Sequence, residues 1–357
     1  MTTSAPELRV AVIGFGLAGS TFHAPFIEIT PGLRLSAIVT RDPERRERAR
    51  QVHPSARLLS SADEILANPR DYDVVVIASP NATHVPLALA TLDADLHVIV
   101  DKPFAGSADE ARQITERAAA RGLLVVPFQN RRWDGDFLTV RKLVSAGTLG
   151  DVYRFESRFE RWRATPRARW CEPSAAANHE GIVYDIGPHL VDQALALLGP
   201  VREVYAELDR RHPDVRVDDD AFIALTHASG IRSRIYASIA AAQSGPRFLV
   251  HGSKAAYVKY GLDPQEAALR AGARAGASDW GEEPESAWGT VGIGGDGRRV
   301  RTEPGAYQRF YEGVERTLHE GAAPPVDARD AVAGLEIIEA AFASAARRTV
   351  ISVEPQK

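Results

Sequence analysis

The sequence predicts a doubly wound parallel α/β sheet in residues 1–128, followed by an α+β domain with a large, mostly antiparallel open sheet in residues 129–357. Three features predict this arrangement. Short apolar runs alternate with helical patterns over the first 128 residues, and a glycine-rich turn follows the first run. From residue 151 onward, apolar and polar residues alternate, as in antiparallel strands with one packed face. Two domains also suit a chain of 357 residues.

The first apolar run, Leu8–Ile13, is predicted to be a strand that leads through a tight turn into a helix over Ser20–Ile29. A strand, a G-x-G-x-x-G turn and a helix together are typical of dinucleotide-binding folds, in which the helix N-terminus binds the pyrophosphate. The turn residues are therefore expected to bind a cofactor: Gly14, Phe15, Gly16, Leu17, Ala18 and Gly19.

The second strand, Leu33–Thr40, ends where such folds distinguish NAD from NADP. An acidic residue at this position binds the ribose 2′-hydroxyl of NAD, whereas an arginine accommodates a 2′-phosphate. The chain has Thr40 and Arg41 here, so we expect NADP to be preferred. In the alternative, Arg41 is solvated, Asp42 takes the acidic role, and NAD is the cofactor.

Further βα units follow in order. We expect helices over Ser61–Asn68, Val85–Ala94 and Ser107–Arg121, and strands over Tyr72–Ala78, Leu96–Val100 and Leu123–Phe128. Loops after parallel strands line the ligand crevice of such sheets. Further cofactor contacts are therefore expected from Ser79, Pro80, Asn81, His84, Asp101 and Lys102. A lysine at a strand end is more often a solvated surface charge, which remains the alternative for Lys102.

The second half is predicted to contain a helix from about residue 129 to 146, antiparallel strands, and a closing helical region. The strands are expected over Asp151–Arg161, Val201–Asp209, Ala221–His227, Ile231–Ala240, Arg247–Gly252 and Ala255–Tyr260, and the closing helices over Tyr307–Gly321 and Asp327–Arg347. One face of this sheet is left open, and a ligand or a second subunit commonly covers such a face.

Asp185 and His189 are four residues apart at a predicted helix start, where Pro188 suits the first turn. A carboxylate beside a histidine orients the ring and raises its basicity, which suits a proton-transfer group. A capping aspartate with a core histidine is the first alternative. A metal pair of His179 or His189 with Asp185 or Asp192 is the second, but no metal-ligand spacing supports it, so no metal is expected.

Composition excludes several other classes of protein. Cys171 is the only cysteine, which rules out an intrachain disulfide and a cysteine zinc site. A formal net charge of −4 gives no indication of nucleic-acid binding. The sequence shows neither a secretory apolar segment nor a run of 18 apolar residues, so we expect a cytoplasmic protein with no membrane partner.

Together these residues resemble the glucose–fructose oxidoreductase/inositol dehydrogenase family (Gfo/Idh/MocA) over nearly the whole chain. The family motifs lie at residues 14–19, 79–84, 101–103 and 185–189. The resemblance implies an N-terminal Rossmann domain and a homo-oligomer, a dimer or tetramer, built across the C-terminal sheet. It also implies Lys102, Asp185 and His189 as the catalytic set.

Residues 21–25, 130–134, 136–139, 155–157, 167–170, 184–185, 251–253 and 261–266 are similar to the NADP-dependent scyllo-inositol 2-dehydrogenase branch of this family. Two positions depart from the usual pattern. Asp101 replaces the usual glutamate but keeps the neighbouring lysine, and Gln129 stands where relatives often have histidine. If that histidine contacts substrate in relatives, the substrate range here differs.

The expected reaction is the reversible oxidation of a ring secondary alcohol of a cyclic polyol or sugar, scyllo-inositol above all. His189 would act as the general base, Asp185 would orient it, and Lys102 would stabilise charge on the reacting oxygen. Substrate contacts are expected from Asn130, Arg132, Trp133, Arg163, Arg169, Trp170 and Tyr184. The alternatives are a dehydrogenase or reductase for another sugar or inositol isomer, and a catalytically silent NADP-binding regulator.

Overall fold

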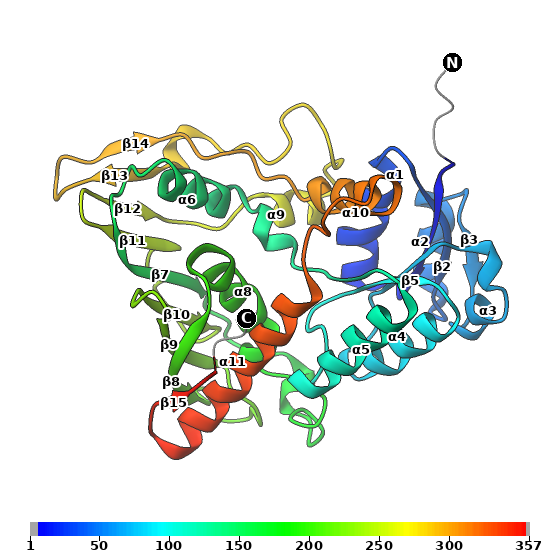
Figure 1. Cartoon of the computed structure of the whole chain (residues 1–357), viewed down its shortest axis with the longest axis horizontal. Coiled ribbons are helices and arrows are strands. Elements are labelled where there is room, and N and C mark those ends of the chain that lie inside the picture. Colours follow the sequence, from blue (N-terminus) through cyan, green and yellow to red (C-terminus); the bar gives the residue numbers. More distant parts are fainter. Residues whose placement is uncertain (1–5, 355–357) are drawn as a thin grey trace. The chain divides into compact units, whose positions relative to one another are not determined.

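The computed structural model describes residues 6–354, which form two compact units (Figure 1). The first unit comprises residues 6–130, 266–280 and 307–331. The second comprises residues 131–265, 281–306 and 332–354. The sequence predicts a single boundary at residue 128, whereas the chain crosses between the units several times.

The first unit contains a six-stranded parallel sheet in the order β3-β2-β1-β4-β5-β6. This is the doubly wound order, in which ligands bind at the carboxyl ends of the strands. The predicted fold class of this half is therefore confirmed. The strands are β1 (Leu8–Ile13), β2 (Leu33–Val39), β3 (Arg57–Leu59), β4 (Val74–Ile77), β5 (His97–Val100) and β6 (Val125–Pro127).

Most helices of the first unit begin and end close to the predicted positions. Ser107 caps α5 by accepting a hydrogen bond from the Glu110 amide at 3.2 Å, and Gly122 ends the helix at φ +65°. The helix after the glycine turn differs, because its segment Gly19–His23 is a π-helix. The helices are α1 (Ala24–Ile29), α2 (Pro43–Val52), α3 (Asp63–Leu66), α4 (His84–Asp93), α5 (Ala108–Arg121) and α10 (Gln308–Glu320). Residues 266–270 of α9 (Gln265–Arg270) also belong to this unit.

Aromatic packing explains why residues 307–331 belong to the first unit. Phe310 lies with its ring edge-on to Phe128 at 4.8 Å, and the Tyr311 hydroxyl is 2.6 Å from Nδ1 of His23. These side chains are buried. Burial of large rings contributes strongly to core stability, so the late helix α10 is part of the first core.

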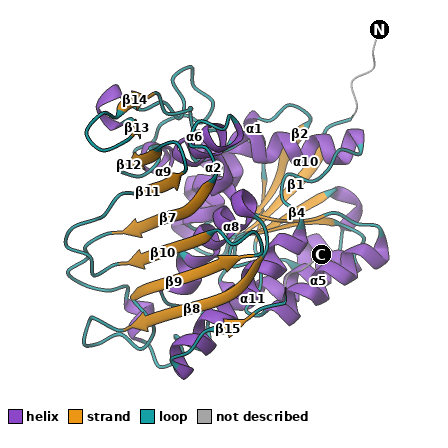
Figure 2. Cartoon of the chain, turned by 60° about the vertical axis from the view of Figure 1, so that its left-hand side comes forward, coloured by secondary structure: helices purple, strands orange, loops and turns teal. Residues whose placement is uncertain are grey.

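The second unit contains a nine-stranded sheet in the order β14-β13-β12-β11-β7-β10-β9-β8-β15 (Figure 2). Only β7 and β10 pair in parallel, which confirms the predicted large, mostly antiparallel sheet. The strands are β7 (Val152–Glu160), β8 (Val201–Asp209), β9 (Asp220–His227), β10 (Arg232–Ser238), β11 (Phe248–Gly252), β12 (Ala256–Lys259), β13 (Gly289–Gly292), β14 (Arg298–Val300) and β15 (Ile351–Ser352).

Helices cover one face of this sheet. Along β9, Ala221, Ile223 and Leu225 are buried, while the residues between them are half-buried. Ser344 of α11 accepts a hydrogen bond from the Ala206 amide of β8 at 3.0 Å. The other face therefore carries the partly exposed side chains. The helices are α6 (Gly135–Ser145), α7 (Ile182–Asp185), α8 (Gly187–Leu198) and α11 (Ala328–Arg347).

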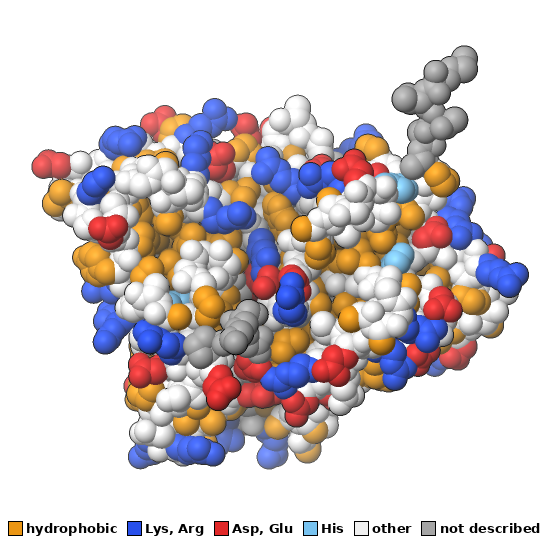
Figure 3. Space-filling view, in the orientation of Figure 1, with side chains coloured by type: hydrophobic (Ala, Val, Ile, Leu, Met, Phe, Trp, Pro, Cys, Tyr) orange, Lys and Arg blue, Asp and Glu red, His pale blue; other side chains and the backbone are white. Residues whose placement is uncertain are grey.

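Surface charge is mixed. On the face shown in Figure 3, acidic and basic side chains are interspersed, which agrees with the small net charge of −4. Among residues 6–354, no helix is both long and apolar enough to cross a membrane.

Candidate functional site

Two of the three motif glycines are required by the packing of the protein itself. Gly14 has φ +99°, and a Cβ atom there would lie 2.4 Å from the Ala78 carbonyl oxygen. A Cβ atom at Gly19 would lie 2.0 Å from the carbonyl oxygen of Gly14. The turn between β1 and the helix is therefore closed by contacts that only glycine permits.

Gly16 is different, because the protein itself leaves room for a side chain there. A Cβ atom at this position would have Nη1 of Arg45 as its nearest neighbour, at 3.6 Å. The helical backbone begins at the next residue, Leu17, so its first N–H groups lie at this turn. The open space over Gly16 and these donors fit the pyrophosphate of a dinucleotide.

Arginines follow the carboxyl end of β2, and the carboxylate beside them, Asp42, caps a helix. Asp42 accepts a hydrogen bond from the Arg45 amide at 2.9 Å and so caps α2. Arg41 donates from Nε to the Ser60 carbonyl at 3.0 Å, and Arg46 donates to the Thr40 carbonyl at 3.0 Å. Arg45 was not among the predicted contacts, since a charged helix normally indicates only a solvated face.

His84 connects two loops at the carboxyl ends of strands. Its Nδ1 is 2.8 Å from the Pro103 carbonyl oxygen, its Nε2 is 2.9 Å from the Ser79 carbonyl oxygen, and the side chain is buried. Ser79 also bonds Thr83 through their hydroxyls at 2.6 Å. The His84 ring therefore holds the loop that contains Pro80 and Asn81 to the turn after Lys102, where the Lys102–Pro103 peptide bond is cis.

Asp101 fixes the backbone of Lys102 from a buried position. Its Oδ1 accepts a hydrogen bond from the Lys102 amide at 2.7 Å, and its Oδ2 lies 3.9 Å from Nε2 of His23. Burial alone would raise the pKa of Asp101, but interactions with His23 and Lys102 outweigh it and hold the pKa below its usual value. Burial raises the pKa of Tyr311, which also contacts His23, well above its usual value. Asp101, although shorter than the glutamate usual in the family, therefore still contacts the Lys102 amide and the His23 ring.

In the second unit, His189 lies in the first turn of α8, as expected, whereas Asp185 is the last residue of the separate short helix α7 and not part of the same helix start. His189 is 5% exposed. Nη2 of Arg167 lies 2.9 Å from Oδ2 of Asp185, so the carboxylate is ion-paired. Arg167 was not predicted as a site residue; its signal in the sequence was its place in residues 167–170, one of the segments similar to the scyllo-inositol 2-dehydrogenase branch.

The segment after β6 contains residues that were expected to bind substrate, and the structure gives them structural partners. Arg132 forms a bidentate ion pair with Asp192 of α8. The Trp133 carbonyl accepts hydrogen bonds from the Ala306 amide at 2.9 Å and from Nε2 of Gln265 at 3.1 Å. Asn130 is buried. For Arg132 this geometry favours a positioning role.

The loop between β7 and α7 is also held by side-chain contacts. Trp170 is fully buried and donates from Nε1 to Glu180 at 3.0 Å, while Arg169 pairs with the same carboxylate at 2.7 Å. The Arg163 carbonyl bonds the His212 ring at 2.9 Å. Trp170 therefore supports the loop rather than offering a surface to substrate. Tyr184 stacks on Phe342 at 5.5 Å and lies on the wall of a cavity described below.

Within residues 6–354, no group of three or more histidine, cysteine, aspartate or glutamate side chains is arranged to hold a metal ion. The alternative of a metal pair around His179, His189, Asp185 and Asp192 gains no support from this arrangement. Asp185 and Asp192 instead pair with arginines.

Comparison with known proteins agrees with the two halves of the chain. Residues 8–128 match the family model of the NAD-binding Rossmann fold oxidoreductases, and residues 137–258 match the GFO/IDH/MocA C-terminal domain. The uncharacterized oxidoreductase YdgJ of Escherichia coli is 38% identical over 97% of this chain and 98% of its own. The scyllo-inositol 2-dehydrogenase (NADP(+)) IolW of Bacillus subtilis is 32% identical over 97% of this chain and 96% of its own.

The solved structure of YPO2259 from Yersinia pestis superimposes with a TM-score of 0.91 at 36% identity, covering 99% of both chains. With this similarity and the geometry of the glycine turn, the first unit is an NAD(P)-binding Rossmann domain. The chain belongs to the Gfo/Idh/MocA oxidoreductase family.

Proposed function

We propose that the protein is an NADP-preferring dehydrogenase that oxidises a ring secondary alcohol of a cyclic polyol, scyllo-inositol in the first instance. The observation that carries the proposal is the pair of Asp185 and His189, placed four residues apart at the junction of α7 and α8 in a chain with an NAD(P)-binding domain. The named activity of IolW, a relative over nearly the full length, supports the choice of substrate.

In this proposal a bound nicotinamide would supply the acceptor for the hydride of the carbinol carbon. His189 removes the hydroxyl proton, so that the alcohol loses a hydride and a proton and becomes a ketone. Asp185 orients the His189 ring, with Arg167 holding the carboxylate. Lys102, whose backbone Asp101 fixes, stabilises the charge that develops on the reacting oxygen.

The catalytic assignment is tested by Lys102→Ala and His189→Ala, assayed with scyllo-inositol and NADP. A group that transfers a proton or stabilises charge typically contributes ~10²–10⁴-fold, so we expect kcat to fall by that order in both variants, while cofactor binding, followed by fluorescence titration, is retained in His189→Ala. Near-normal turnover in either variant would refute the role of that residue.

The cofactor preference follows from the end of β2. Asp42 already caps α2 through Oδ1, whereas Nη1 of Arg45 is the atom nearest to the open space at Gly16 and Arg41 lies two residues after the end of β2. We therefore propose that kcat/KM is higher with NADP than with NAD. The reverse order would overturn this reasoning while leaving the reaction class intact.

A second substrate class is supported by another relative. A D-apiose dehydrogenase of Paraburkholderia graminis is 27% identical over 96% of this chain. A dehydrogenase for another sugar or inositol isomer is therefore the second candidate. A panel of inositols, inososes and aldoses, each tested with both cofactors, separates the two candidates by their kcat/KM values.

We also propose that two copies of the chain associate through the open face of the second sheet. Phe222 and Tyr236 lie side by side there with ring centroids 5.0 Å apart, and the Arg158 guanidinium covers Tyr236 at 4.2 Å. Glu156, 5% exposed, pairs with Arg158 on the same face. We expect light scattering to show a dimer or tetramer that Tyr236→Glu dissociates; a wild-type monomer would contradict this.

A further inference from the structure

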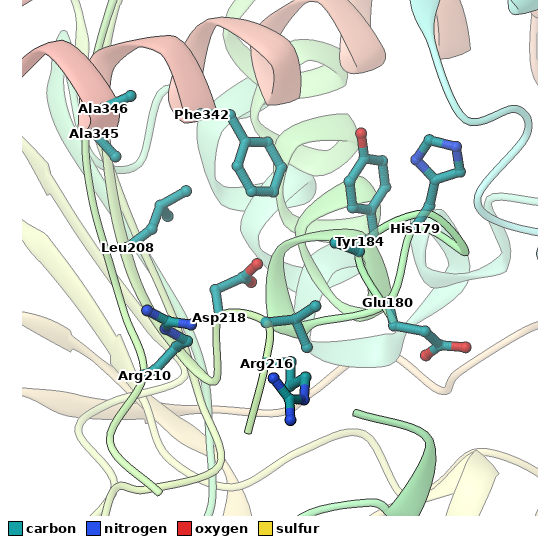
Figure 4. A pocket seen from close by; sticks show the side chains of 12 residues that line it. His179, Glu180, Tyr184, Leu208, Arg210, Arg216, Asp218, Phe342, Ala345 and Ala346 are labelled. Atoms are coloured by element: carbon teal, nitrogen blue, oxygen red, sulfur yellow. The ribbon is translucent and has the colours of Figure 1, made fainter. Parts of the chain in front are cut away.

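The second unit contains a cavity whose lining includes none of the three proposed catalytic residues, although Tyr184, an expected substrate contact, lies on its wall (Figure 4). Its volume is about 590 Å³, within the range of small-molecule sites. The cavity lies between the end of α11, the end of β8 with the following connection (residues 208–218), and the segment 176–184. Each of these segments belongs to the second unit, so the cavity is formed by one compact body.

One wall of the cavity is aromatic. The rings of Tyr184 and Phe342 lie 5.5 Å apart at an interplanar angle of 26°, and His179 meets Tyr184 edge-on at 5.0 Å. Leu208 and Val217 add apolar surface. A wall of this kind binds the flat face of a ring or an apolar group.

Two arginines supply positive charge. Arg210 and Arg216 line the cavity, are exposed, and have no side-chain hydrogen bond or ion pair with any residue in 6–354. Of the two acidic residues in the lining, Glu180 is already neutralised by Arg169 at 2.7 Å. Asp218 is the only other acidic residue that lines the cavity, so the positive charge exceeds the remaining negative charge.

We propose that this cavity binds a small anion in which a carboxylate or phosphate lies next to a flat ring. The guanidinium groups of Arg210 and Arg216 hold the anionic group, since arginine forks match the geometry of carboxylates and phosphates. The ring of the ligand packs on Tyr184 and Phe342.

The cavity is connected to the candidate active site through Asp218. Its side chain accepts a hydrogen bond from the Val183 amide at 2.7 Å, and its carbonyl accepts one from the Ile182 amide at 2.8 Å. Asp218 therefore anchors the start of α7, the helix that ends at Asp185. Occupancy of the cavity is expected to change the rate of turnover. This consequence rests on the proposed function, whereas binding itself does not.

Binding is tested by calorimetry on the full-length, cofactor-loaded protein, with phenyl phosphate and benzoate as probes and benzyl alcohol as the uncharged control. We expect the charged probes to bind with affinities near the millimolar range, and benzyl alcohol much more weakly. The absence of saturable binding for both charged probes, or equal binding of benzyl alcohol, overturns the proposal.

Two variants locate the site. Removing both cations with Arg210→Ala and Arg216→Ala should weaken binding about tenfold or more, since charge-assisted hydrogen bonds are lost. Ala345→Phe fills the cavity and should abolish binding without touching either arginine. Arg202→Ala, an exposed arginine of β8 outside the cavity, is the matched control and should bind as the wild type does. Unchanged binding in both site variants overturns the assignment to this cavity.

Initial rates at saturating probe give the second readout. We expect a change in kcat or KM for the wild type and none for the double arginine variant. If the protein binds the probes through Arg210 and Arg216 but oxidises no polyol, the anion site stands and the proposed function fails. If the protein binds the probes but its turnover is normal and does not change when a probe is bound, the link through Asp218 is wrong.

Discussion

Arg132 and Asp192 form a bidentate ion pair, in which Nε is 2.8 Å from Oδ2 and Nη2 is 2.6 Å from Oδ1. The side chains are only 13% and 3% exposed. Asp192 lies one turn after His189 on α8, so the pair ties the segment after β6 to the helix that carries the candidate base. Both oxygens of the carboxylate are engaged, which makes Arg132 a positioning residue for α8.

Arg132→Ala is therefore expected to act on stability. Removal of one partner leaves a buried charge uncompensated, which costs about 3–5 kcal/mol. We expect a large fall in the free energy of unfolding measured in urea. Arg211→Ala, which removes exposed ion pairs with Asp209 and Asp220, is the matched control and should change stability little. Equal effects of the two variants would contradict the role given to the buried pair.

The glycine turn gives a second prediction, because Gly16 and Gly19 differ in what surrounds them. Gly16→Ala should fold normally, since its Cβ meets nothing closer than 3.6 Å, yet bind the cofactor about tenfold or more weakly because the methyl group occupies the space for the pyrophosphate. Gly19→Ala places a methyl group 2.0 Å from a carbonyl oxygen and should be unstable. Thermal unfolding and cofactor titration of both variants check this; wild-type affinity in Gly16→Ala would refute it.

The sequence was informative wherever structure depends on neighbouring residues. The periodicity of apolar residues located five of the six strands of the first sheet, all but the short β3, and Ser107 and Gly122 marked the ends of α5. These features are local, because caps and strand patterns are set within a few residues. His189 could likewise be placed at a helix start from the sequence alone, although the break between α7 and α8 after Asp185 could not.

Contacts between distant residues could not be predicted in this way. Nothing near His23 indicates that its ring bonds Tyr311, 288 residues later, or that α10 joins the first core. The same holds for Arg132, which was expected to contact substrate and whose side chain pairs with Asp192. A single sequence gives residue types and local patterns, whereas tertiary partners of arginine and histidine are fixed by packing.

Arg41 and Arg45 give a prediction on cofactor choice. Hydrogen bonds to charged groups contribute ~1.5–3 kcal/mol, so Arg41→Ala combined with Arg45→Ala should lower kcat/KM with NADP about tenfold or more and leave that with NAD little changed. Arg48→Ala, an exposed arginine on the same helix, is the control. An equal loss with both cofactors would show that the two arginines do not recognise the 2′-phosphate.

Asp218 gives a prediction on pH. Burial raises its pKa from 3.8 to about 6, although the amides of Ile182 and Val183 lower it and Asp219 raises it further. The folded protein thus holds a proton that the unfolded chain releases between about pH 4 and pH 6, so stability falls as the pH rises through this window, by ~3 kcal/mol in total.

Asp218→Asn keeps an acceptor for the Val183 amide and removes this titration. The stability of Asp218→Asn relative to the wild type should therefore rise from pH 4 to pH 6 and then level off, as measured by urea unfolding at each pH. Asp214→Asn, on an exposed part of the same connection, should leave the profile of the wild type unchanged. A stability difference between Asp218→Asn and the wild type that does not vary with pH would show that Asp218 is not the buried titrating group.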